Sequence, residues 1–265
     1  MRNFMKLLMM VVIAGLVFTA CKKESNYVGQ DEISQETITK ISNLGFNTSN
    51  VQVTEGGYLV EGDIFLSDVN LNERPTSPKL RIAEVEQYRT FNTVGINRTI
   101  SVSVSGSVSS AFSRSVDNAI ARYNAENLLI KFSRVSTSGN IVIRIVNTGQ
   151  YIASAGFPTS DGNPYHEVKY AKKYTTYSDG FMTTVLAHEL GHCIGFRHTD
   201  YMNRSVSCGS GGNEGQETSG VGAVHIPGTP TTDPDRDSWM LACLSATTNR
   251  PFNANDKIAL GYLYK

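Results

Sequence analysis

One stretch decides the fold of this chain: HELGHCIGFRH, at residues 188–198. It has the pattern HExxHxxGxxH and holds three of the five histidines in the sequence. On a helix, His188 and His192 lie four residues apart and project from one face, where they can bind one zinc ion. Gly195 can adopt the positive φ that ends a helix, so that the chain turns back and brings His198 to the metal. Three protein ligands leave one position open, whereas a structural zinc site is usually closed by four.

Glu189 indicates that the zinc site is catalytic, because a carboxylate beside the metal can hold and deprotonate a water molecule. The alternative is a helix that happens to be rich in histidine. HExxH alone is compatible with that alternative, but the added Gly and third His arise by chance in roughly one of 100,000 chains of this size. An apolar face at helical spacing precedes and spans the motif, and Asp179-Gly180 is the expected start. Its members are Phe181, Val185, Leu186, Leu190 and Ile194.

The N-terminus has the features of a secretion signal. Arg2 and Lys6 flank an apolar run at residues 7–18, which is shorter than the ~20 residues of a membrane span. Thr19-Ala20 before Cys21 resembles a bacterial lipobox, in which the cysteine is lipidated and becomes the mature N-terminus. We therefore expect a signal peptide at 1–20, an exported bacterial lipoprotein on the periplasmic or cell-surface side of the outer membrane, and a tether at 21–33. Phe18 departs from the usual Leu, which leaves an ordinary signal peptide or a signal anchor as alternatives.

The remaining composition is that of a globular protein with no formal net charge. No basic tract extends beyond Lys22-Lys23 and Lys172-Lys173, so nucleic-acid binding has no electrostatic support. We expect a monomer. The other cysteines are Cys193, Cys208 and Cys243. An exported chain permits one disulfide, for which Cys208–Cys243 is the preferred pair, although the sequence leaves the connectivity open.

The chain divides into a small front region at 34–90 and a larger domain at 91–265. The front region is too small for us to expect a stable, independently folded domain. The larger one has the α/β (α+β) pattern of helices packed against a twisted sheet. The expected elements are helices at 34–44, 112–123 and 256–264, strand material at 51–66, strands at 100–104, 129–132 and 141–146, an edge strand at 166–174, a linker at 70–80 and a functional loop at 202–237.

Residues 97–265 resemble the metzincin clan of zinc endopeptidases. Ser238-Trp239-Met240 matches the clan's Met-turn, which makes Met240 the methionine expected beneath the zinc. Residues 255–264 look like the final metzincin helix. The best likeness within the clan is to the bacterial dual-action HEIGH metallopeptidases, through HELGH, His198-Thr199-Asp200 and Gly228-Thr229-Pro230. The resemblance implies a mostly parallel sheet with an antiparallel edge strand, an active-site helix, a Met-turn and a C-terminal helix.

Two features of related families have no counterpart in this chain. Astacins carry a tyrosine ligand two residues after the Met-turn methionine, where this chain has Ala242. The segment at 156–166 resembles the structural zinc segment of matrixins but lacks the accompanying histidines, so a second zinc is not expected. Asp233, Asp235 and Asp237 are compatible with calcium, although acidic loop residues are usually just solvated.

The front region carries a second resemblance. Val60-Glu61-Gly62-Asp63-Ile64 is similar to the F-x-G-D-I motif of astacin prosegments, in which the aspartate blocks the catalytic zinc. The resemblance implies that Asp63 occupies the fourth metal position until the prosegment is removed. Val60 replaces the aromatic residue, and Gly-Asp is also common in a simple turn at a strand end.

Together these features predict a zinc metalloendopeptidase. Zinc held by His188, His192 and His198 would activate a water molecule, with Glu189 as general base. A protein or peptide substrate would pair with the strand at 166–174. A zinc hydrolase of non-protein amides is one alternative, and a lipid-anchored binding or adhesion protein is another. Glu189 argues against the second alternative, since a purely structural zinc site has no use for that carboxylate.

Overall fold

The computed structural model describes residues 33–72, 87–210, 222–231 and 235–265. The expected signal peptide, the cysteine expected to carry a lipid (Cys21), most of the linker at 70–80 and Asp233 therefore lie outside the described residues. Among the residues that are described, no helix is both long and apolar enough to span a bilayer.

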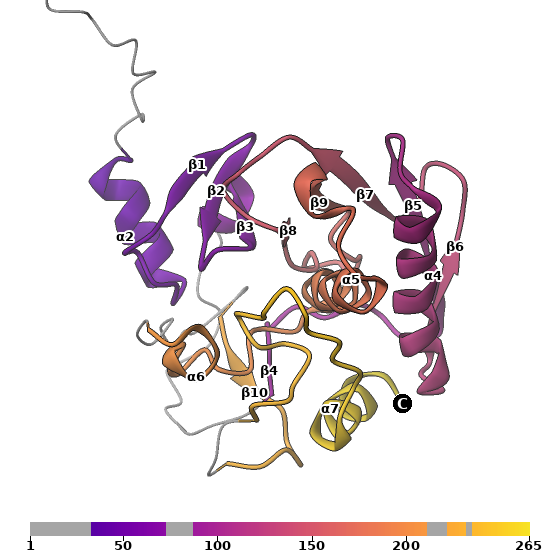
Figure 1. The fold of residues 1–265 in the computed structure, drawn as a ribbon. Helices are drawn as coiled ribbons and strands as arrows, with labels where there is room; N and C mark the ends of the chain where they lie inside the picture. Colours follow the sequence, from indigo (N-terminus) through magenta and orange to yellow (C-terminus); the bar gives the residue numbers. More distant parts are fainter. Residues whose placement is uncertain (1–32, 73–86, 211–221, 232–234) are drawn as a thin grey trace, which may run out of the picture. The chain divides into compact units, whose positions relative to one another are not determined.

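An eight-stranded sheet forms the centre of the fold, in the order β1-β2-β3-β8-β9-β7-β5-β6 (Figure 1). Strands β9, β7, β5 and β6 pair in parallel, while β8 is antiparallel to β9 and β1 is antiparallel to β2 at the edge. This confirms a mostly parallel sheet with antiparallel strands toward one edge. The strands are β1 Gln52–Thr54, β2 Gly57–Val60, β3 Ile64–Ser67, β5 Arg98–Ser105, β6 Ile130–Arg134, β7 Ile141–Val146, β8 Ala153–Ala155 and β9 Glu167–Ala171.

Two long helices, α4 (Ser110–Ala125) and α5 (Asp179–Ile194), pack against each other and against the sheet (Figure 1). Helix α5 begins at Asp179, as expected, and its N-cap is Ser178, whose side chain accepts a hydrogen bond from the Phe181 amide. Its residues from Phe181 onward are buried on every side, so the predicted apolar face is only part of what the core covers. Gly195 ends the helix with φ +115°, as the sequence predicted.

The prediction of an edge strand at 166–174 was wrong. Strand β9 occupies part of that range but lies between β7 and β8, with partners on both sides. The strand beyond it, β8, is the three-residue segment Ala-Ser-Ala, which is too short to show an alternating pattern in the sequence. Since β9 is already paired twice, a substrate has no free edge there.

The front region folds as helix α2 (Gln35–Asn43), strands β1 to β3 and the short helix α3 (Asp68–Leu71). Ser34 caps α2, and the strands fall within residues 51–66 and one residue beyond, so both predictions are confirmed. Strands β2 and β3 form a hairpin in which Val60 pairs with Ile64 around a three-residue tip. Strand β3 then pairs in parallel with β8 through Ile64 and Ala155. The region has its own small core: Ile41, Leu44, Phe46, Val60, Ile64, Leu66 and Leu71, together with Phe157.

The described residues of the expected loop at 202–237 contain two short elements. Helix α6 (Ser205–Cys208) and strand β10 (Val224–His225) lie within the expected loop at 202–237, and β10 pairs with β4 (Tyr88–Arg89). A disulfide joins Cys208 to Cys243, which confirms the preferred pair, and Cys193 is a buried free thiol. Helix α7 (Ala254–Tyr264) closes the chain as predicted, and a single 3-10 turn, η1 (Lys172–Tyr174), follows β9.

Candidate metal centre

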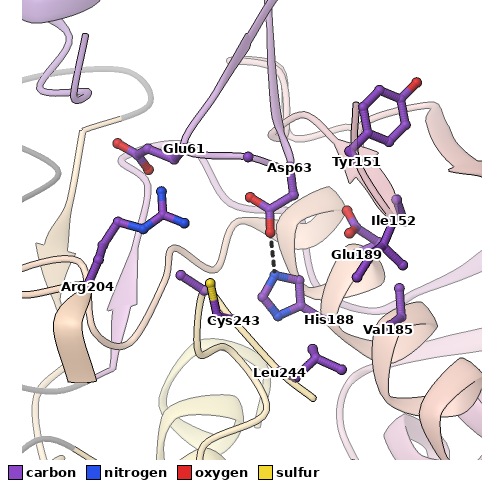
Figure 2. Close-up of a pocket in the computed structure, with 13 residues that line it drawn as sticks. Glu61, Asp63, Tyr151, Ile152, Val185, His188, Glu189, Arg204, Cys243 and Leu244 are labelled. Atoms are coloured by element: carbon purple, nitrogen blue, oxygen red, sulfur yellow. Dashed lines mark ion pairs between the residues drawn. The ribbon is translucent and has the colours of Figure 1, made fainter. Parts of the chain in front are cut away.

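Three histidines and one aspartate converge at the hairpin tip. His188 and His192 come from α5, His198 follows the turn at Gly195, and Asp63 comes from the loop between β2 and β3. One potential ligand atom from each of the four lies within 4.8 Å of the others. Asp63 Oδ2 is 3.2 Å from His198 Nε2 and 3.4 Å from His188 Nε2 (Figure 2). Among the described residues, this is the one group with the composition and spacing of a metal site.

The unsatisfied polar atoms at this point fit a metal ion. Nε2 of His188, Nε2 of His192 and Oδ1 of Asp63 are buried without a hydrogen-bond partner. Buried polar atoms in proteins are nearly always hydrogen-bonded, so orphan atoms that converge need another partner. Imidazole nitrogens and a carboxylate oxygen are the ligands that zinc accepts in a four-coordinate site.

Backbone carbonyls hold two of the rings in the orientation that a metal requires. His188 Nδ1 lies 2.9 Å from the carbonyl oxygen of Trp239, and His192 Nδ1 lies 2.7 Å from that of Phe196. Because a carbonyl can only accept, each Nδ1 carries the proton and each Nε2 keeps its lone pair for the site. Burial lowers the pKa of His192 well below its usual range, and the neighbouring His188 and His198 lower it further, which also favours the neutral ring.

Met240 packs beneath the helix where the Met-turn resemblance places it. Its side chain is fully buried, and a Cβ built on Gly191 would lie 2.6 Å from its sulfur. The Thr199 amide donates to the carbonyl oxygen of Met240 at 2.8 Å, directly after His198. The turn therefore supports both the helix and the third histidine without offering a ligand.

Glu189 lies beside the histidines and lines the same cavity (Figure 2). Burial holds the pKa of its carboxyl well above the usual range, and the negative charge of Asp63 adds to the rise. Its Oε2 has no hydrogen-bond partner. A carboxylate so placed can accept a proton from a group bound at the histidines.

The cavity next to the histidines measures about 230 Å³. Its apolar wall is built from Tyr151, Ile152, Val185 and Leu244. The hairpin tip closes it on one side, and Cys243 of the disulfide forms part of another side (Figure 2). The site therefore has a space beside it that is large enough for a side chain of a bound peptide.

Sequence reasoning missed one pair at this site, the ion pair between Glu61 and Arg197. The Arg197 Nη2 to Glu61 Oε2 distance is 3.4 Å, and both side chains are fully buried. The guanidinium lies 4.2 Å from the ring of Phe46 and 5.8 Å from that of Phe157. The partners are 136 positions apart, so no local pattern links them. The one available signal in the sequence was the position of Arg197 inside the motif at 188–198.

Asp235, one of the residues considered for calcium, is occupied by amide donors. The side chains of Asn253 and Asn255 donate to its carboxylate at 2.8 to 3.1 Å, and the Asp237 amide donates at 3.1 Å. Through these contacts Asp235 supports the start of α7, whose N-cap is Asn253.

The fold and the site define a zinc metallopeptidase. The sequence profile of the dual-action HEIGH metallopeptidases matches residues 58–264, and the chain belongs to this family. No curated protein sequence matches it. Two solved structures of myroilysin are similar to it. One is 14% identical with a TM-score of 0.42 and covers 65% of this chain and 82% of that chain. The other is 15% identical with a TM-score of 0.41 and covers 66% and 86%.

Proposed function

We propose that this protein is an exported, lipid-anchored zinc endopeptidase that its own β2–β3 hairpin holds latent. One observation carries the proposal: the ligand atoms of His188, His192 and His198 converge with that of Asp63 within 4.8 Å. The lipobox-like segment before Cys21 supports export and lipidation. Protein or peptide outside the cytoplasm would then be the substrate.

The chain's own residues supply the acid–base chemistry. His188, His192 and His198 would hold the zinc ion, which when bound would activate a water molecule and polarise the scissile carbonyl. Glu189 accepts the proton from that water and returns it to the leaving amine. The raised pKa of Glu189 supports this role, because it brings the carboxyl closer to the pH at which it must both accept and release a proton.

Asp63 explains latency in this proposal. Its carboxylate lies where the fourth ligand of a three-histidine site belongs, so it would exclude the water on which hydrolysis depends. The backbone at Asp63 also occupies a hydrogen-bonding group of β8, since the Ala155 amide donates to the Asp63 carbonyl at 3.0 Å. A peptide that added to β8 as a new strand would need β3 to leave first.

Further contacts hold the hairpin and its neighbours against the sheet. Glu55, between β1 and β2, pairs with Arg144 of β7 at 2.9 Å, and its carbonyl accepts from Lys169 of β9 at 3.0 Å. The Lys169 ammonium also lies 4.8 Å from the centre of the Phe65 ring. Because these contacts are spread over three strands, we expect complete release of the front region to require cleavage of the chain.

We place the activating cleavage between Asn72 and Gln87, before the end that the sequence suggested for the front region at residue 90. The buried Gln87 side chain donates to Ser238 at 3.0 Å and to Asp256 at 2.6 Å, beside the Met-turn. The Arg197 amide donates to the carbonyl of Tyr88 at 2.8 Å. Residues from Gln87 onward therefore support the catalytic part and should stay with it.

The test is cleavage of a mixed fluorogenic peptide library by the wild type and by Glu189→Gln. A recognition site for a specific protease, placed within residues 73–80, allows the front region to be cut and removed by gel filtration. We expect chelator-sensitive cleavage to appear after the cut and to be absent in Glu189→Gln. Bound zinc without cleavage by the cut wild type would instead favour a binding protein or a non-protein amide substrate.

A further inference from the structure

We infer that Arg197 forms a carboxylate-binding subsite, so that the active enzyme prefers substrates with an acidic side chain near the scissile bond. The inference rests on the proposed function, because it takes the hairpin tip as the occupant of the substrate cleft. It adds the chemical class of one substrate residue, which the zinc site itself does not define.

The hairpin tip delivers two carboxylates to the cleft. Asp63 reaches the histidines, and Glu61, two residues earlier, reaches Arg197 at 3.4 Å. Glu61 has φ +56° and Gly62 has φ +98°, so the tip adopts a left-handed turn. That conformation is costly for a glutamate, and it places the side chain where it is fully buried. The tip thus resembles an occupant shaped to fit the site.

Fold stability alone gives little reason for an arginine at this position. A buried ion pair has to overcome the desolvation of both charges, and well-packed apolar residues are often as stable or more stable. The carboxylate oxygen of Glu61 that pairs with Arg197 also lies 3.9 Å from His198 Nδ1, so the guanidinium is held next to the candidate metal site. A buried charge at this place is better explained by exchangeable partners, namely Glu61 in the latent protein and a substrate carboxylate in the active enzyme.

Removal of the front region would open one side of this guanidinium. Two of its neighbours, Glu61 and Phe46, precede residue 73 and would leave, whereas Phe157 would stay. Phe157 lies edge-on to the His192 ring, with centroids 5.4 Å apart, and follows β8 by two residues. The arginine would then border the cleft beyond the C-terminal end of β8. A planar guanidinium there can accept a carboxylate through two parallel hydrogen bonds.

The experiment compares peptides that differ only by Glu against Gln at single positions around one cleavage site. The cut enzyme with the front region removed should cleave the Glu peptide about tenfold faster at one position, a difference of about 1.4 kcal/mol, because only the Glu side chain gains a charge-assisted hydrogen bond from Arg197. Arg197→Gln should abolish that preference, so that the Glu and Gln peptides of each pair are cleaved at the same rate. Arg197→Lys should retain part of it, because it keeps the charge and loses the planar geometry.

Arg204→Gln is the matched control, because Arg204 also lines the cavity near Gly62. A preference that disappears in this variant and survives in Arg197→Gln would overturn the assignment. So would equal cleavage of Glu and Gln peptides at every position, a result that would leave the peptidase proposal intact. Fluorescence anisotropy with the cut Glu189→Gln protein measures binding of the same labelled peptides without turnover. It should show the same preference, and equal binding of all pairs would overturn the inference even if no peptide were cleaved.

Discussion

Gly195→Ala probes the turn that carries the third histidine to the metal. Gly195 has φ +115°, and a Cβ there would lie 2.9 Å from the Asn92 carbonyl oxygen and 3.3 Å from Thr90 Oγ1. The left-handed conformation costs an L-residue about 1–2 kcal/mol, and overpacking adds about 1–3 kcal/mol, so the free energy of unfolding should fall by about 2–5 kcal/mol. At about 2–4 °C per kcal/mol, the Tm should drop by about 4–20 °C.

Two other glycines separate the contributions in the same thermal unfolding assay, followed by circular dichroism. Gly209 has φ +71° with no atom within 4 Å of an added Cβ, so Gly209→Ala should show only the conformational cost of about 1–2 kcal/mol. An added Cβ at Gly149 also meets nothing within 4 Å, and Gly149→Ala should be nearly neutral. Zinc affinity should fall only in Gly195→Ala, because His198 would shift. A Tm drop in Gly195→Ala no larger than in Gly209→Ala would refute this reasoning.

Three further outcomes follow from the site. Glu189→Gln should lower the cleavage rate of the cut enzyme by about 10²–10⁴-fold while its zinc content, measured by mass spectrometry, stays at the wild-type level. A loss of zinc would mean that Glu189 holds the metal. Gln87→Ala should reduce the free energy of unfolding in urea by about 1–3 kcal/mol, because it leaves the buried Asp256 carboxylate short of a donor. An unchanged midpoint would place Gln87 outside the catalytic core. Replacing both Cys208 and Cys243 by serine should cost about 3–4 kcal/mol for a separation of 35 residues, measured in the same way. A cost near zero would show that the bridge does not constrain the unfolded chain.

The sequence predicted which histidines come together, because their spacing follows from helix geometry. His188 and His192 share a helical face, and Gly195 is a conformational requirement that can be read from one residue. The long helices and most of the strands were also predicted, since each carries its own periodic pattern. Residue spacing and conformational preference within each segment were sufficient to predict all of these features.

Features that depend on long-range pairing were not predictable in the same way. Strand β8 has only three residues, so nothing in the sequence indicated that β9 would be internal to the sheet. Glu61 and Arg197 are each ordinary surface residues by type, and their burial arises only when the hairpin meets the helix turn 136 positions later. A resemblance drew attention to Asp63, but the hairpin that positions it depends on tertiary packing.

The most direct test of the account is the cleavage rate of the uncut protein with Asp63→Ala. Loss of a charge-assisted contact worth about 1.5–3 kcal/mol should let the hairpin open about ten- to hundredfold more often, and should raise the low zinc-dependent peptide cleavage of the uncut protein by about the same factor. Asp68→Ala, the same change at an exposed position on α3, is the control and should have no effect. If the Asp63→Ala protein binds zinc and cleaves no faster than the wild type, the hairpin does not hold the enzyme latent through Asp63.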